Sequence, residues 1–141
     1  MSDNWQKDVE EFNTLIGRST QTRPGVPSED DIRMNITMLK EEFQDELIPA
    51  LEKMASTGTW NDDNFIPQLA DVMDGVLDIV YYLLGIPPIL GIKSGPIWDA
   101  IHESNMLKFS GPARSDGKRE KPADWKHPDI KALIEDQLSA L

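Results

Sequence analysis

The sequence predicts an all-α protein, a helical bundle of about four to five helices in one domain covering residues 1–141. A chain of 141 residues suits one compact domain with a sizeable core. Apolar residues recur at helical spacing in several segments, and no segment shows convincing strand alternation. Pro and Gly lie between these segments, where helices are expected to end.

Helices are predicted in five places. We expect the first to begin with Ser2 or Asp3 as its cap and to end near Ile16. Ser28, followed three residues later by Asp31, resembles a capping box at the start of a long helix. Pro49 should kink or break that helix, because it lacks a backbone N–H. The five ranges are approximately 3–16, 29–55, 65–84, 96–108 (capped by Ser94) and 128–138.

The bulk composition limits the function classes. The chain has 25 Asp and Glu against 14 Lys and Arg, a formal charge of −11, which argues against nucleic-acid and anionic-membrane partners. There is no cysteine, so disulfides and thiolate chemistry are excluded. The N-terminus lacks a signal-peptide pattern, and the longest apolar run, 79–92, is too short to span a bilayer. These features predict a cytoplasmic protein.

Positive charge gathers near the C-terminus. Between Lys108 and Lys131 there are seven basic and four acidic residues, a net charge of +3. Residues 109–127 form a long basic loop, and loops of that length in small domains often bind ligands. A local site for an anionic small molecule and a solvated loop of mixed charge are both compatible with this pattern.

Three aspartates interrupt an otherwise apolar helix. Apart from the three aspartates, all residues from Asp71 to Leu84 are apolar, aromatic or Gly, and no Lys or Arg occurs among them. Asp71, Asp74 and Asp78 follow i, i+3, i+7 spacing and therefore share one stripe. An all-round apolar helix is typical of a buried helix. Buried carboxylates without a cation are costly, so a divalent cation is expected to face them.

A second acidic helix supplies matching carboxylates. Residues 41–47 read Glu-Glu-Phe-Gln-Asp-Glu-Leu, and Glu42 and Glu46 flank the apolar face of their helix. Two facing acidic helices in a bundle core can form a metal site. A solvated acidic face is the structural alternative. An EF-hand loop is absent, and the only two histidines, His102 and His127, are too few to favour a histidine site.

These motifs resemble the MazG-like all-α NTP pyrophosphohydrolases, particularly the small phage-type members. Such proteins carry Glu-Glu-x-x-Glu on one helix and Glu-x-x-Asp on the next. The likeness covers roughly residues 34–130 and rests on the order of several loose motifs. They are Asp71-x-x-Asp74 with Asp78, Ser104-Asn105-Met106-x-Lys108, Asp116-Gly117-Lys118 with Lys121-Pro122, and Trp125-x-x-Pro128-Asp129-Ile130.

The first acidic motif departs from the family pattern and has two registers. Glu41-Glu42-x-x-Asp45 keeps the doublet but ends in Asp. Glu42-x-x-x-Glu46 keeps the outer acids but places Phe43 at the second acidic position. We favour the second register, because Glu42 and Glu46 flank the apolar face.

The resemblance implies an enzyme that hydrolyses a nucleoside triphosphate to a monophosphate and pyrophosphate with Mg²⁺ or Mn²⁺. Within it, Glu42, Glu46, Asp74 and Asp78 are the expected catalytic and metal-binding residues. Glu41, Asp45 and Asp71 are further candidate ligands. The candidate substrate-binding residues are Asn105, Lys108, Arg114, Lys118 and Trp60, with Trp98 and Trp125 as other surfaces for base stacking.

The substrate and assembly are predicted as follows. We favour a purine deoxynucleotide such as dGTP, the substrate of the phage MazZ branch. Other branches hydrolyse dUTP or phosphoribosyl-ATP, and a non-catalytic metal-binding bundle or a structural helical protein is the alternative outside the enzyme class. The excess of apolar helix surface predicts a homo-oligomer, a homodimer or homotetramer, and the family resemblance implies the same.

Overall fold

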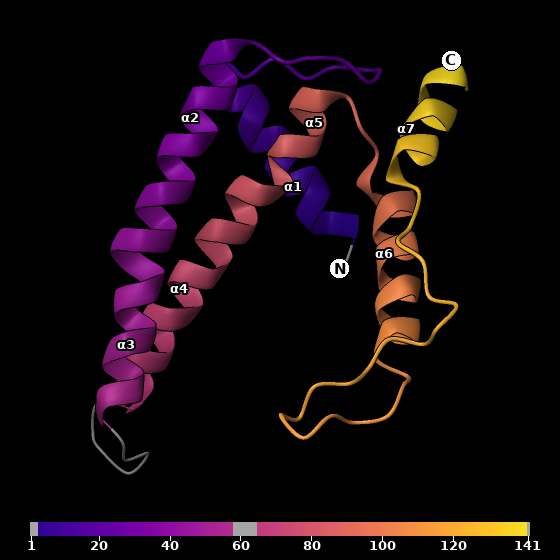
Figure 1. Cartoon of the computed structure of the whole chain (residues 1–141). Helices are drawn as coiled ribbons and strands as arrows, with labels where there is room; N and C mark the ends of the chain where they lie inside the picture. Colours follow the sequence, from indigo (N-terminus) through magenta and orange to yellow (C-terminus); the bar gives the residue numbers. More distant parts are fainter. Residues whose placement is uncertain (1–2, 58–64, 141) are drawn as a thin grey trace.

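The computed structural model describes residues 3–57 and 65–140, and this part of the chain is all-α, as predicted (Figure 1). The single pair of bridged residues described there, Ala113 and Arg119, belongs to no strand. The described helices are α1 (Asp3–Leu15), α2 (Glu29–Lys40), η1 (Glu41–Leu47), α3 (Ile48–Thr57), α4 (Phe65–Leu84), α5 (Ile86–Leu90), α6 (Ser94–Lys108) and α7 (Ile130–Ser139).

The predicted long helix is present but is not α-helical throughout. α2 and α3 are joined by η1, a seven-residue π-helix, so the helix continues past Pro49 instead of breaking there (Figure 1). In η1 the hydrogen bonds span five residues, as in the bond from Ile48 N–H to Phe43 O. The wider turns just before Pro49 relieve the clash that a proline ring makes with the carbonyl four residues earlier. Ser28 caps α2 as expected, and its hydroxyl accepts from Asp31 N–H at 3.2 Å.

The helix formed by α2, η1 and α3 packs along α4 (Figure 1). The two helices approach each other closely at Gly75 of α4, which is buried, and Leu47 of η1. A Cβ at position 75 would lie only 3.2 Å from the Leu47 Cα. Gly75 is therefore the residue that lets the two acidic helices come together.

The N-terminal helix covers the far end of α4. Phe12 and Tyr81 make an edge-to-face ring contact with centroids 5.1 Å apart, and the Asn13 side-chain amide donates to Gly85 O at 3.0 Å. After Gly85 the chain forms the short helix α5, which contains Pro87 and Pro88. Both lie in the first turn of α5, where a missing N–H costs no hydrogen bond.

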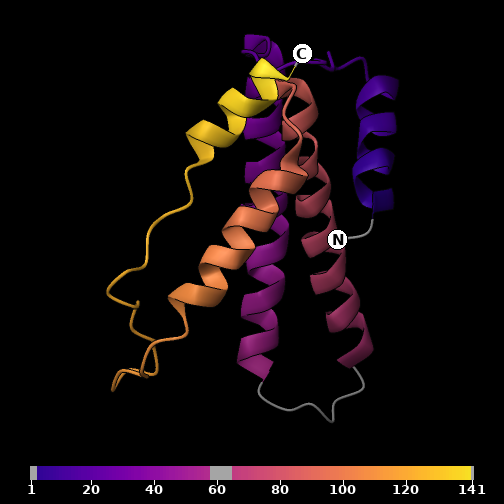
Figure 2. The same cartoon turned by 90° about the vertical axis from the view of Figure 1, so that its right-hand side faces the viewer.

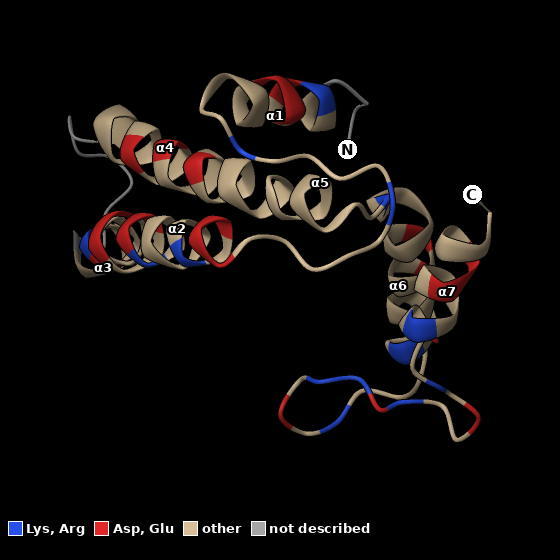
Figure 3. Ribbon diagram, turned by 90° about the horizontal axis from the view of Figure 1, so that it is seen from above, with Lys and Arg blue, Asp and Glu red and all other residues tan. Residues whose placement is uncertain are grey.

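Helices α6 and α7 pack on each other and stand apart from the pair formed by α2 and α4 (Figures 1 and 3). Figure 2 shows α6 inclined to that pair. The Gln137 side chain of α7 exchanges two hydrogen bonds with the Lys93 backbone, at 2.8 and 2.9 Å. Ser94 is the first residue of α6 rather than its cap, which is Lys93. Asp129 caps α7 by accepting from Ala132 N–H at 3.0 Å.

The core of one described chain is thin. Among the described residues, Val9, Leu47 and Ile89 are the buried hydrophobic side chains. The expectation that α4 is buried all round is wrong for one chain, because Gly75 is its one buried residue and Ile66, Met73 and Leu77 are exposed. Much apolar helix surface is therefore left facing outward. Across the ranges 3–57 and 65–140, no helix has the length and apolar character required to cross a membrane.

Candidate active site

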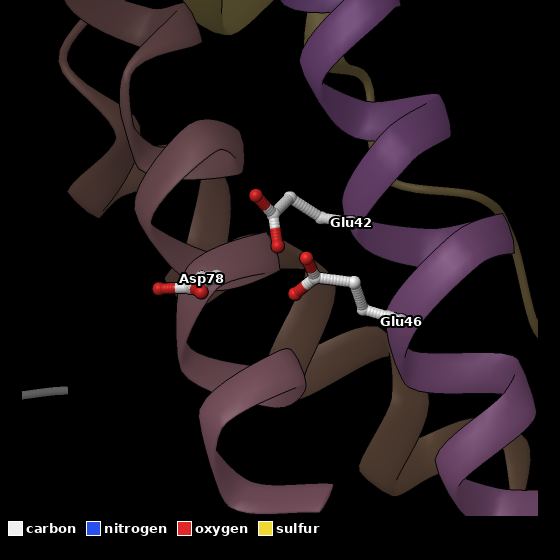
Figure 4. A group of neighbouring side chains, drawn as sticks. All are labelled: Glu42, Glu46 and Asp78. Atoms are coloured by element: carbon white, nitrogen blue, oxygen red, sulfur yellow. The ribbon is translucent and has the colours of Figure 1, made fainter. Parts of the chain in front are cut away.

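Three carboxylates from two helices meet between η1 and α4 (Figure 4). Glu42 and Glu46 extend from η1 toward α4, and Asp78 lies opposite them. One oxygen from each carboxylate lies within 4.8 Å of the others. The residues are one helical turn apart in η1, so both glutamates project from the same side. π-Helical segments occur frequently at functional sites, and here one carries the acidic motif.

Glu42 is the most perturbed acid of this cluster. Burial, and then the charges of Glu46, Asp78 and Glu41, raise the pKa of Glu42 from 4.5 to about 7. Its Oε2 atom is buried and has no hydrogen-bond partner among the residues that the structure describes. A buried carboxylate oxygen without a donor is unfavourable unless a cation or a proton satisfies it. The donor set of Glu42, Glu46 and Asp78, all oxygen and all acidic, is what a hard divalent cation prefers.

Asp78 shows the same effect from the α4 side. Burial raises the pKa of Asp78, and the charges of Asp74 and Glu46 raise it further. Burial also raises the pKa of Tyr82, one turn later on α4, with the Glu42 charge as the next cause. The region between η1 and α4 therefore has an excess of negative charge that a bound cation would offset.

The other predicted acids lie around this cluster. Asp74 is exposed but close enough to raise the pKa of Asp78. Glu41, Asp45 and Asp71 are exposed and are not among the three clustered carboxylates. The geometry brings together the two glutamates of the favoured register, Glu42 and Glu46. Their roles as ligands stay predictions.

The predicted substrate-binding residues occupy a different part of the fold. Asn105 and Lys108 lie in the last turn of α6. Arg114 and Lys118 lie in the segment between α6 and α7, where Arg114 pairs with Asp116 at 3.0 Å. Within one chain this segment is well separated from η1 and α4 (Figures 1 and 3). Trp98 is exposed, and Trp60 lies outside the described residues.

Sequence reasoning missed two polar groupings. Arg18, Asn13 and Asn35 are buried, Arg18 donates to Asn35, and Arg18 and Asn13 both lie beside Gly85, although each alone resembles an ordinary surface residue in the sequence. Lys121 and Lys108, which are 13 positions apart along the chain, both approach the Trp125 ring. Only the second grouping had a signal in the sequence, namely the basic segment with an aromatic residue inside it.

Comparison with protein families decides the class. The model of the phosphoribosyl-ATP pyrophosphohydrolase family matches residues 9–105, which is more than half of the chain. The chain belongs to the phosphoribosyl-ATP pyrophosphohydrolase family. A search among curated proteins finds no match. The matched range contains η1, α4 and all seven acidic candidates, and it ends at Asn105, so the segment between α6 and α7 lies outside it.

Membership confirms the coarse part of the resemblance, because this family is one of the MazG-like all-α NTP pyrophosphohydrolases. The chain is a nucleotide pyrophosphohydrolase. The cluster of Glu42, Glu46 and Asp78 is suited to bind the divalent metal on which such enzymes typically depend. The family match does not distinguish among nucleotides.

Proposed function

We propose that the protein hydrolyses a purine deoxynucleoside triphosphate, dGTP first among them, to the monophosphate and pyrophosphate. The observation that carries the proposal is the cluster of Glu42, Glu46 and Asp78 across η1 and α4. Cleavage between the α and β phosphates needs neutralisation of phosphate charge and an activated water. A carboxylate cluster that binds a divalent cation provides for both, and the family match supplies the reaction class.

In this proposal Mg²⁺ or Mn²⁺ is held by Glu42, Glu46 and Asp78, with Asp74 completing the set. The bound cation would lower the pKa of a coordinated water and screen the phosphates. The chain's own part is to hold the carboxylates in place. Gly75 sets the distance between η1 and α4 by allowing contact with Leu47. Burial of Glu42 keeps its carboxylate poorly solvated, so that it gains most when a cation arrives.

The triphosphate end is proposed to contact Asn105, Lys108, Arg114 and Lys118. These residues belong to α6 and the following segment, and residues 108–131 carry a net charge of +3 in an otherwise acidic protein (Figure 3). Charge-assisted hydrogen bonds to phosphate oxygens are among the stronger polar contacts. Arg114 must give up its pairing with Asp116 to take part.

Phosphoribosyl-ATP is the second candidate substrate, and the description of the matched family favours it. The phage-type motifs beyond residue 105 favour the purine deoxynucleotide instead, as in the MazZ branch. Both substrates would present a purine and a phosphoanhydride to the same carboxylates. dUTP is the third alternative within the superfamily.

We further propose that residues 1–141 form one domain that functions as a homodimer or homotetramer. Met73, Leu77 and Tyr81 form an exposed stripe along α4, and Trp98, Leu107 and Phe109 are exposed on and after α6. Apolar surface of this extent on helix faces is typical of protein interfaces. A second chain would also offer a route for the basic segment to approach an acidic cluster, since the two are separated within one chain (Figure 3).

The test is a substrate panel with product analysis. The purified protein is incubated with dGTP, other NTPs and dNTPs, dUTP and phosphoribosyl-ATP, each with Mg²⁺, Mn²⁺ or EDTA. We expect monophosphate and pyrophosphate, fastest from dGTP, and no turnover in EDTA. Preference for phosphoribosyl-ATP would select the second candidate. Release of diphosphate and orthophosphate would contradict the proposed bond cleavage.

A further inference from the structure

A cluster of cationic and aromatic side chains surrounds Trp125, in the segment between α6 and α7. The Lys121 ammonium lies 4.7 Å from the centroid of the Trp125 ring, and the Lys108 ammonium lies 5.5 Å from it. The His127 ring meets the same indole edge-on, with centroids 4.5 Å apart. Both ammonium distances are within the range of cation–π attraction.

Trp125 is itself anchored to α6. Its indole N–H donates to the Ser104 carbonyl at 2.9 Å, in the last turns of that helix. The ring therefore has a fixed position relative to Lys108, which belongs to the same helix end. A half-buried indole held in this way is a support for neighbouring side chains rather than a free surface for base stacking, which was one role considered for it.

The segment between residues 109 and 120 is folded so that Lys121 returns to the end of α6. Arg114 N–H donates to Lys118 O at 2.6 Å, and Glu120 N–H donates to Pro112 O at 2.9 Å. At the tip, Gly117 adopts a positive φ of 83°. At the base, Gly111 lies against the Glu120 carbonyl so closely that any Cβ there would collide with it. The hairpin-like fold thus brings Lys121 to the same Trp125 ring that Lys108 approaches.

The positively charged side chains of this region fall into two groups, those that bond within the hairpin and those that lie at the Trp125 ring. Arg114 pairs with Asp116 at 3.0 Å, and the Arg119 guanidinium donates to Gly111 O at 3.2 Å, so both stabilise the hairpin. No carboxylate pairs with Lys108 or Lys121 in the part of the chain that the structure describes. Two like charges gathered at one indole repel each other, and an anion beside them would remove that repulsion.

We propose that Lys108 and Lys121, held together by Trp125, form a binding site for the terminal phosphates of the substrate and for the pyrophosphate product. The proposal deepens the proposed function and rests on it. Trp125 is a positioning residue, and Lys108 and Lys121 make the phosphate contacts. Lys121 thereby joins the proposed phosphate contacts beside Lys108, and it needs no rearrangement of the hairpin, whereas Arg114 must first give up Asp116.

The test measures binding of inorganic pyrophosphate without turnover. Titration calorimetry at low salt measures this binding. EDTA in the buffer removes divalent metal, so pyrophosphate cannot bind through a metal at the acidic cluster. We expect Lys108→Met and Lys121→Met each to weaken pyrophosphate binding about tenfold, as befits loss of one charge-assisted contact. Lys126→Met is the matched control, because it removes the same charge next to Trp125 from a side chain with no described contact to the ring, and it should change binding less than twofold.

Trp125 has its own test. Trp125→Leu should weaken pyrophosphate binding about as much as the two lysine variants together, whereas Trp125→Phe, which keeps a ring for the ammonium groups, should lose less. Circular dichroism and thermal melting of each variant establish that it is folded. Equal losses in Lys108→Met, Lys121→Met and Lys126→Met would show only a general charge effect and would overturn the proposal, as would unchanged binding in the first two.

Failure of this inference and failure of the proposed function give different results. If nucleotide is converted to monophosphate but pyrophosphate binding does not depend on Lys108 and Lys121, the phosphate site is wrong and the proposed reaction stands. If pyrophosphate binding follows the expected pattern but no nucleotide is hydrolysed, the anion site stands and the proposed reaction is wrong.

Discussion

The Arg18 guanidinium donates to the Asn35 side-chain oxygen at 2.7 Å, and both residues are buried, with exposed fractions of 5% and 4%. Arg18 follows α1 and Asn35 lies in α2, so this bond joins the N-terminal helix to the helix that continues into η1. The Arg18 Nε and Nη2 atoms have no protein partner, and no carboxylate pairs with Arg18 in the described residues. Among the described residues, the hydrogen bond to Asn35 is therefore the main interaction that offsets the cost of burying the Arg18 charge.

Asn35→Leu should destabilise the protein by about 2–3 kcal/mol, because it leaves the buried guanidinium without this partner. Chemical denaturation measures the change. The double variant Arg18→Met with Asn35→Leu should be less destabilised than the sum of the two single variants by about 1–2 kcal/mol, since it removes the charge as well. Strict additivity would show that the two side chains do not stabilise each other.

Gly75→Val should destabilise the protein by about 2 kcal/mol and weaken Mn²⁺ binding. Any Cβ at position 75 lies 3.2 Å from the Leu47 Cα, and backbone cannot move aside as a flexible side chain can. The added volume forces α4 away from η1 and spreads the three carboxylates. Denaturation and metal titration measure the two effects. Gly95→Val is the control, because a Cβ there meets nothing within 4 Å and should leave Mn²⁺ binding unchanged.

The metal-free protein should lose stability as the pH rises from about 4.5 to about 7. The pKa of Glu42 is raised from 4.5 to about 7, so in this window the folded state binds more protons than the unfolded state. The raised pKa of Asp78 acts in the same direction. Melting temperatures in EDTA between pH 4.5 and 8 test this. Glu42→Gln should flatten the dependence, and a slope identical to that of the wild type would contradict the pKa assignment.

Asp78→Asn should reduce nucleotide turnover at least about 100-fold while leaving the metal-free protein as stable as the wild type at pH 8. The substitution removes one of three mutually repelling carboxylates, which relieves repulsion in the metal-free protein but also removes one metal ligand. Added Mn²⁺ should raise the melting temperature of the wild type and raise that of Asp78→Asn much less, by linkage. If Asp78→Asn unfolds the protein and Mn²⁺ does not protect the wild type, the carboxylates are a structural network.

Light scattering at micromolar concentration should give a mass at least twice the 15.9 kDa of one chain. Met73→Glu combined with Leu77→Glu should shift the mass toward one chain, because both side chains are exposed on α4 and would place charge in the interface. Val26→Glu is the control, since Val26 is an isolated apolar residue in the loop between α1 and α2, and its replacement should leave the mass unchanged. A wild-type mass of 15.9 kDa would show a monomer and would contradict the proposed oligomer.

The sequence alone determined the helical class, because apolar periodicity and the breakers between helices are local properties. The range predicted for the aspartate helix, 65–84, is the range observed for α4. The acidic residues of the two helices, the family to which they point and the basic segment before α7 were also readable from the chain. Pro49 was identified as a place where the helix should kink or break, but the π-helix that precedes it was not predicted.

The tertiary structure decided which of these residues meet. Seven acidic candidates were spread over two helices, and the contact of Gly75 with Leu47 places Glu42, Glu46 and Asp78 together. The burial of Arg18 beside Asn35 was likewise invisible in the sequence. The basic segment around Trp125 was visible, but which of its lysines approaches the ring was not. The physical reason is that helix formation depends on neighbours within a turn or two. Side-chain clusters depend on how far apart and at what rotation two helices pack, and residues distant in the chain set both.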